Sequence, residues 1–167
     1  MTGRWTLPPL APGDLAPDFK GVSRLNPKFH FSTVAGRHVL MGFLPRDARL
    51  REAAYAAVEP LLDVCQDPSA AAFFIVRQTI EEGAPPDRQG VRWFFDPAGE
   101  IAPLYHMGDD GGWVLLDPAM RVVAIAPLQA PEPVFERFAR LPSVDDYAGV
   151  PLVAPTLILD RKSTRLN

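Results

Sequence analysis

The sequence predicts an α/β domain in which helices flank a mixed central sheet, and three stretches carry this prediction. Residues 38–44 (HVLMGFL) and 71–76 (AAFFIV) are continuous apolar runs, which are typical of strands buried on both faces. Between them, residues 49–64 place apolar side chains at i, i+3, i+4 and i+7, as on one face of a helix. A buried strand, a helix and a second buried strand indicate a crossover to a parallel neighbour in one sheet.

The remaining elements are shorter. A short strand at residues 29–31 is expected to reach the strand at 38–44 through a hairpin turn at 33–37. Further strands are expected at residues 91–95, 113–116 and 121–127. Helical segments are expected at 100–107 and 131–141, with a turn at 96–99 and a polar loop at 78–90. This order predicts a thioredoxin-like sandwich, with Phe19 as a core residue.

Composition excludes several classes of function. The chain has 167 residues, 47% of them hydrophobic, which fits one globular domain. Its net charge of −3, without a Lys/Arg block, argues against nucleic-acid or anionic-membrane binding. No apolar run reaches the roughly 18 residues of a membrane span, and no signal peptide begins the chain, so a cytoplasmic protein is expected. The single cysteine excludes an internal disulfide and a cysteine-based zinc site.

The sequence divides into three parts. Residues 1–141 are expected to form the domain, and residues 142–159 are interpreted as a linker and the start of a truncated second domain. Residues 160–167 (DRKSTRLN) resemble the translation of a sequencing-library adapter and are interpreted as an artefact.

Several motifs stand in an order that resembles a known family. They are Ala16-Pro17-Asp18-Phe19, the apolar strand ending at Pro45, residues 95–102 (FDPAGEIA) with Tyr105, and residues 114–118 (VLLDP). Together they resemble peroxiredoxins of the alkyl hydroperoxide reductase/thiol-specific antioxidant group, over roughly residues 10–141. The resemblance implies a thioredoxin-like redoxin fold.

The same resemblance predicts that the family's chemistry is absent. The family places a hydroxyl residue four positions after the proline, a peroxidatic cysteine three positions later, and an arginine on a later strand. Aligned on Pro45, the first two positions are Arg49 and Glu52, and the arginine position falls at Gly111-Gly112. A carboxylate cannot attack a peroxide as a thiolate does, so the sequence predicts a catalytically degenerate domain.

A second resemblance concerns the partner. Residues 26–29 (NPKF) and the tail at 148–159 are similar to bacterial proteins that continue into a 2-oxoglutarate/Fe(II) oxygenase domain. This resemblance implies an accessory or interaction domain whose partner is its own C-terminal oxygenase domain. No cofactor is expected in the chain itself, and the sequence does not indicate an oligomeric state.

Two alternatives remain open. The chain could be a thiol-dependent hydroperoxide peroxidase that uses Cys65, although a buried structural cysteine near a helix end explains this residue more simply. It could also be a small-ligand or redox-sensing module with a pocket around Pro45, Arg49 and Glu52. A solvated helix start with Asp47 as N-cap is the simpler explanation of these residues.

Other candidate sites are weaker. His106 and Asp109 have H-x-x-D spacing, whereas an oxygenase iron site needs H-x-D and a later histidine, which is missing. His30 and His38 are interpreted as residues on the strand surface. Residues 108–112 (GDDGG) lack the lysine and helix of a phosphate loop, which indicates a turn. Among Trp93, Phe94 and Phe95, alternation in a strand predicts that at least one faces outward, where it could mark a domain contact, although core packing is the simpler explanation.

Overall fold

A mixed five-stranded sheet forms the centre of the computed structural model, which describes residues 9–79, 82, 85 and 88–141. The strand order is β5-β4-β3-β6-β7. The strands are β3 (His38–Leu44), β4 (Ala70–Val76), β5 (Val91–Phe95), β6 (Gly112–Leu116) and β7 (Val122–Ala126). β3, β4 and β5 run parallel, while β6 runs antiparallel to both β3 and β7. The predicted mixed sheet is therefore confirmed.

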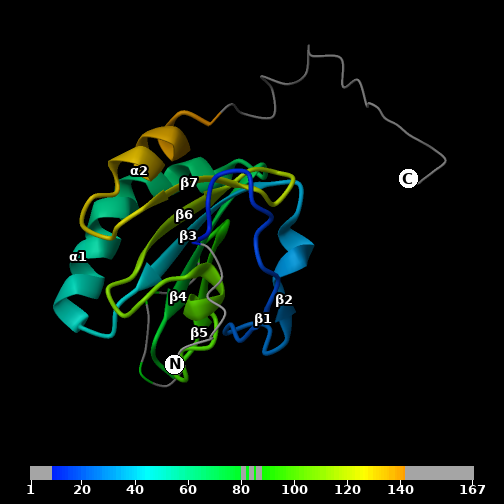
Figure 1. The fold of residues 1–167 in the computed structure, drawn as a ribbon. Helices are drawn as coiled ribbons and strands as arrows, with labels where there is room; N and C mark the ends of the chain where they lie inside the picture. The colour runs from blue at the N-terminus through cyan, green and yellow to red at the C-terminus, as the bar shows by residue number, and fades with distance from the viewer. Residues whose placement is uncertain (1–8, 80–81, 83–84, 86–87, 142–167) are drawn as a thin grey trace, which may run out of the picture.

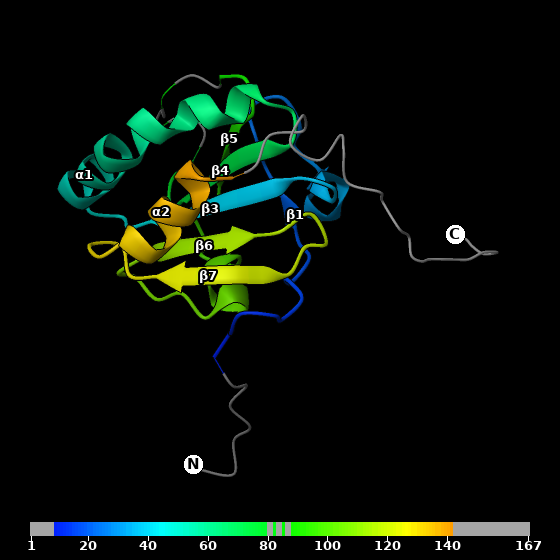
Figure 2. The ribbon, with the colours of Figure 1, turned by 90° about the horizontal axis from the view of Figure 1, so that it is seen from above.

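Different layers cover the two faces of the sheet (Figure 1). One face carries α1 (Ala48–Val58), the 3-10 helix η2 (Glu59–Gln66) and α2 (Glu132–Ala139), which Figure 2 shows from above. The other carries the N-terminal ribbon of β1 (Lys20–Gly21) and β2 (Phe29–His30), together with the 3-10 helices η1 (Phe31–Val34) and η4 (Ala102–Tyr105). Phe19 is buried in this second layer, as predicted.

Covering both faces buries every residue of β3 and β4. Side chains alternate between the two cores: Leu40 and Leu44 pack toward the helices, while Met41 packs toward the N-terminal ribbon. The same alternation buries Trp93 and Phe95 on one face and Phe94 on the other. The expectation that one of these three faces outward is therefore wrong, because both faces of the sheet are covered here, and the simpler explanation, core packing, is confirmed.

The expected helix at residues 49–64 is divided into two segments. α1 ends at Val58, and Pro60 then lies near the start of η2, where its missing N–H cannot continue the α-helical ladder. Ala54, Val58 and Leu62 face the sheet, whereas Leu50 is 39% exposed. Leu50 lies beside Pro131, in the loop before α2. The periodicity places Leu50 on the buried face of the helix, but the residue does not contribute to the core.

The predicted hairpin at residues 33–37 is also wrong. β2 pairs with β1, in the register Lys20↔His30, and η1 then leads to β3. His38 begins this central strand and is 9% exposed, so it is not the surface residue that the sequence predicted, whereas His30 is exposed.

The other elements agree with the sequence. The structure confirms the turn at 96–99, the β6–β7 pair and α2, and it shortens the expected helix at 100–107 to η4. Much of the predicted loop at 78–90 and all of residues 142–167 lie outside the described residues. In the described part of the chain, no helix is long and apolar enough to cross a membrane.

Candidate functional site at the carboxyl edge of the sheet

The carboxyl ends of β3, β4 and β5 meet the amino end of β6 at one edge of the sheet. In the strand registers, Phe43 stands opposite Ile75 and Gly112, and Ile75 stands opposite Phe94. The loop residues that follow or precede these strand ends therefore gather here. In open α/β sheets this edge is the usual location of a functional site.

Asp47 caps α1 at this edge, as predicted. Its Oδ1 accepts hydrogen bonds from the backbone N–H groups of Arg49 at 2.9 Å and Leu50 at 3.3 Å. The capping carboxylate thus occupies the position at the helix N-terminus where the dipole favours negative charge. Arg49 and Glu52 are both exposed on the first two turns of α1, and Pro45 is buried at the end of β3.

The position that the resemblance assigns to an arginine lies close to Pro45, but its backbone excludes a side chain. Gly111 has φ +77°, and a Cβ there would stand 2.2 Å from the carbonyl oxygen of Phe43 and 3.4 Å from Cδ of Pro45. At Gly112 a Cβ would stand 2.7 Å from the sulfur of Met107. The contact at Gly111 is with backbone, so this position accommodates no arginine, whereas at Gly112 the flexible Met107 side chain would have to move.

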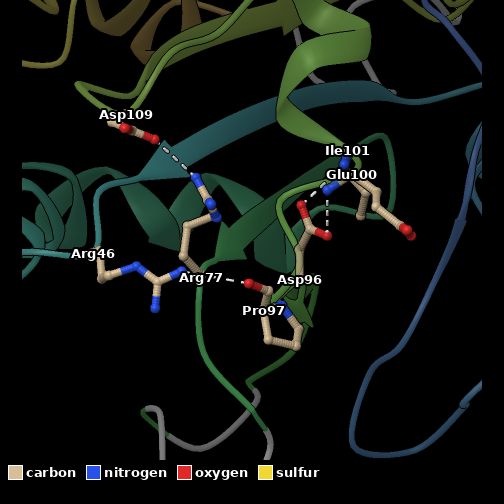
Figure 3. A network of polar contacts seen from close by, with 7 residues as sticks. All are labelled: Arg46, Arg77, Asp96, Pro97, Glu100, Ile101 and Asp109. Carbon is tan, nitrogen blue, oxygen red and sulfur yellow. Dashed lines mark hydrogen bonds and ion pairs between the residues drawn. The ribbon is translucent and has the colours of Figure 1, made fainter.

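Arg77 supplies positive charge at the edge instead, from the end of β4 (Figure 3). Its Nη1 donates to Oδ1 of Asp109 at 3.1 Å, and its guanidinium packs on Gly99, where a Cβ would lie 2.5 Å from Nη2. Sequence reasoning missed Arg77, because its partners come from distant loops. The available signal was a charged residue directly after a buried strand.

The turn below Arg77 is fixed by Asp96. This carboxylate accepts hydrogen bonds from the backbone N–H groups of Glu100 at 2.8 Å and Ile101 at 2.9 Å. Arg46 adds a longer contact of 3.4 Å from its Nη2 to the carbonyl oxygen of Pro97 (Figure 3). Together these contacts make a polar edge.

Metal coordination finds no support at this edge. Asp109 is paired with Arg77, and His106 is the exposed residue after η4, in the left-handed region with φ 59°. Within the described residues, no group of three or more His, Cys, Asp or Glu side chains could hold a metal ion. Gly108 accepts the N–H of Gly111, which places residues 108–111 in a turn.

Cys65 lies at the opposite end of the α1–η2 segment and is 1% exposed. Gly90, with φ +76°, packs directly against it; a Cβ on Gly90 would be 2.3 Å from the carbonyl oxygen of Cys65. Burial raises the pKa of the thiol to about 12, and the nearby Arg88 only partly opposes this. The thiol is therefore neutral and shielded at physiological pH.

Pro45, Arg49 and Glu52 do not converge on one pocket. Glu52 lines a pocket with Tyr55 and Trp93, and neither Pro45 nor Arg49 is among the residues that line it. Pro45 instead contacts the Gly111 turn.

The fold of this chain is shared by structures of redox proteins. No protein-family model matches the sequence, and no curated protein matches it. A Chlorobium tepidum protein described as a thiol:disulfide interchange protein DsbE superposes with a TM-score of 0.60 at 18% identity, over 71% of this chain and 86% of that one. Peroxidoxin BcpB from Mycobacterium tuberculosis gives 0.59 at 14% identity, over 78% and 94%.

A thiol peroxidase from Chromobacterium violaceum gives a TM-score of 0.54 at 15% identity, over 75% of this chain and 82% of that one. At such identities these likenesses define the fold alone. The chain has a thioredoxin-like fold of the kind found in redoxins, which confirms the fold that the sequence predicts.

Proposed function

We propose that this chain is a catalytically degenerate redoxin domain that binds a partner or ligand and carries out no thiol chemistry. The observation that carries the proposal is the place of its one thiol. Cys65 is buried in η2 with a raised pKa, while the start of α1 carries Glu52. The redoxin fold is thus retained while the residues for peroxide reduction are replaced.

The environment at the start of α1 supports this proposal. A peroxidatic thiolate needs a lowered pKa, which a helix N-terminus and a nearby cation provide. Here the Asp47 carboxylate caps the helix, and the backbone at Gly111 leaves no room for an arginine. A single substitution at Glu52 would therefore not restore the site.

A peroxidase that uses Cys65 is the second candidate, and two observations weigh against it. A peroxide would have to reach a side chain that is 1% exposed, and the thiol would have to ionise against a pKa of about 12. Both requirements slow the attack, because the thiolate is the nucleophile.

We further propose that the natural partner is an oxygenase-type domain following in the same polypeptide, as the sequence resemblance implies. The proposal predicts that residues 1–141 and the following domain, expressed separately, form a complex in analytical ultracentrifugation. Two species that sediment independently at all concentrations would contradict it.

The absence of thiol chemistry is tested by trapping. We expect that hydrogen peroxide followed by dimedone leaves Cys65 unmodified in the native protein, as read by intact mass, while the urea-unfolded protein is labelled. Rapid dimedone addition at Cys65 in the native protein would overturn the proposed function.

A further inference from the structure

A pocket of about 320 Å³ lies between α1 and the edge strand β5. Its volume is at the lower end of the range for small-molecule sites. Tyr55 and Glu59 line it from the helical side, and Trp93 lines it from the sheet. Gln78, the residue after Arg77, and Glu52 also line the pocket, so it adjoins the carboxyl edge of the sheet.

The lining is negatively charged. Three carboxylates, Glu52, Glu59 and Glu82, and one guanidinium, that of Arg51, line the pocket, and the guanidinium of Arg88 hydrogen-bonds the Tyr55 side chain. Arg51 already donates from Nη1 to the carbonyl oxygen of Arg46 at 2.9 Å. Burial raises the pKa of the Tyr55 hydroxyl, and the Glu59 carboxylate raises it further, against the opposing effect of Arg88. The pocket thus carries more negative than positive charge.

Trp93 supplies a second and independent observation. Its side chain is buried, with the residue 2% exposed, and its Nε1–H has no hydrogen-bond partner in the described structure. The other described tryptophan, Trp113, donates its Nε1–H to the carbonyl oxygen of Leu128 at 3.1 Å. Since buried indole N–H groups normally find an acceptor, the donor of Trp93 indicates a place for one on a bound molecule.

The aromatic walls are fixed in position. The ring of Trp93 stacks on Phe74 with centroids 4.8 Å apart, and Tyr55 lies 5.4 Å from Trp93. Aromatic faces attract cations through the ring quadrupole, most strongly at Trp. The carboxylates do not assemble as a metal site, since no cluster of the described residues could hold a metal ion. The chemistry therefore fits an organic cation better than an inorganic one.

We propose that this pocket binds a small organic cation, an amine or guanidine that also carries a carbonyl or hydroxyl oxygen. The cation lies by Glu52 and Glu59 and against the aromatic walls, and the oxygen accepts the Nε1–H of Trp93. The inference deepens the proposed function and rests on it, because it gives a domain without thiol chemistry something to bind.

L-argininamide is the probe, because it carries a guanidinium, an ammonium and a carbonyl oxygen. We expect saturable binding by calorimetry below about 10 mM, and a shift of one indole N–H resonance that Trp93→Phe removes. Glu52→Gln combined with Glu59→Gln should weaken binding at least fivefold. Glu136→Gln, which removes a carboxylate from α2, should leave it unchanged. Agmatine, which has no carbonyl, should bind more weakly, and Nα-acetyl-L-citrullinamide, which carries no charge, should not bind.

The source of the cation is distinguished by N-acetyl-Gly-Arg-Gly-amide. Binding weaker than that of argininamide supports a free small molecule, and binding at least tenfold tighter would overturn that choice in favour of an arginine side chain on a polypeptide. No saturation with argininamide, or equal binding of Nα-acetyl-L-citrullinamide, would overturn the inference itself.

A negative result in either binding experiment leaves the proposed function unchanged. The proposed function is tested separately, by the reactivity of Cys65 in the same preparation. If Trp93→Phe does not fold, the affinities of the Glu52/Glu59 variant and of the Glu136 control for argininamide, measured by calorimetry, still test the inference.

Discussion

The reactivity of Cys65 can be predicted quantitatively from its surroundings. Burial raises the thiol pKa from 9.0 to about 12, so at neutral pH the thiolate fraction falls about 1,000-fold. The residue is also 1% exposed, with Gly90 packed against it, so a bulky reagent must wait for local or global opening. Both effects act in the same direction, and we expect native labelling at least about 1,000-fold slower than that of an exposed thiol.

The assay is stopped-flow labelling with 5,5′-dithiobis-(2-nitrobenzoate) in buffer and in urea. A matched control places the thiol on the exposed side of α1, as Ala53→Cys in a Cys65→Ser background. We expect the control to react at the rate of a free thiol in both solvents, and Cys65 to reach that rate only in urea. Native Cys65 reacting within tenfold of the control would refute the reasoning from burial.

Three further predictions concern stability. Gly111→Ala places an alanine at a positive φ, with its Cβ 2.2 Å from the Phe43 carbonyl oxygen, and should lower the free energy of unfolding in urea by about 2–4 kcal/mol. Gly108→Ala, which has open space around it, should change this free energy by no more than about 0.5 kcal/mol. Equal effects of the two substitutions would contradict the close approach at Gly111. Asp47→Ala removes the N-cap of α1 and should cost about 1 kcal/mol, and an unchanged urea midpoint would show that the cap contributes nothing. Burial lowers the pKa of His38, although the Asp117 carboxylate opposes this effect. The unfolded state therefore takes up the proton first as the pH falls, and the stability of the protein decreases below about pH 6.5. His38→Leu should make this decrease in stability less steep, and pH profiles that run parallel for the variant and the wild type would contradict the prediction.

The sequence predicts best where one local signal is sufficient. The apolar runs of β3 and β4 identify strands buried on both faces without any knowledge of their neighbours. The prediction fails where pairing depends on distant residues. β1 has only two residues and no distinct pattern, so its pairing with β2 could not be foreseen and a local hairpin was predicted instead.

The candidate site shows the same division. The Asp47 cap follows from residue identity and spacing alone, whereas the interpretation of Glu52 as the thiol position depends on the family resemblance. The Arg77–Asp109 ion pair does not, because the loops that join these residues lie far apart along the chain. Nor does the unpartnered indole of Trp93, since alternation along β5 places the ring without saying which hydrogen bonds the fold completes.

Hydroperoxide consumption tests the central claim most directly. The purified chain would be assayed with hydrogen peroxide and tert-butyl hydroperoxide, with dithiothreitol or thioredoxin as reductant, beside its Cys65→Ser variant. We predict that both proteins consume peroxide at the rate of the protein-free blank. Saturable consumption by the native chain that disappears in Cys65→Ser would contradict our proposal that this domain of thioredoxin-like fold carries out no thiol chemistry.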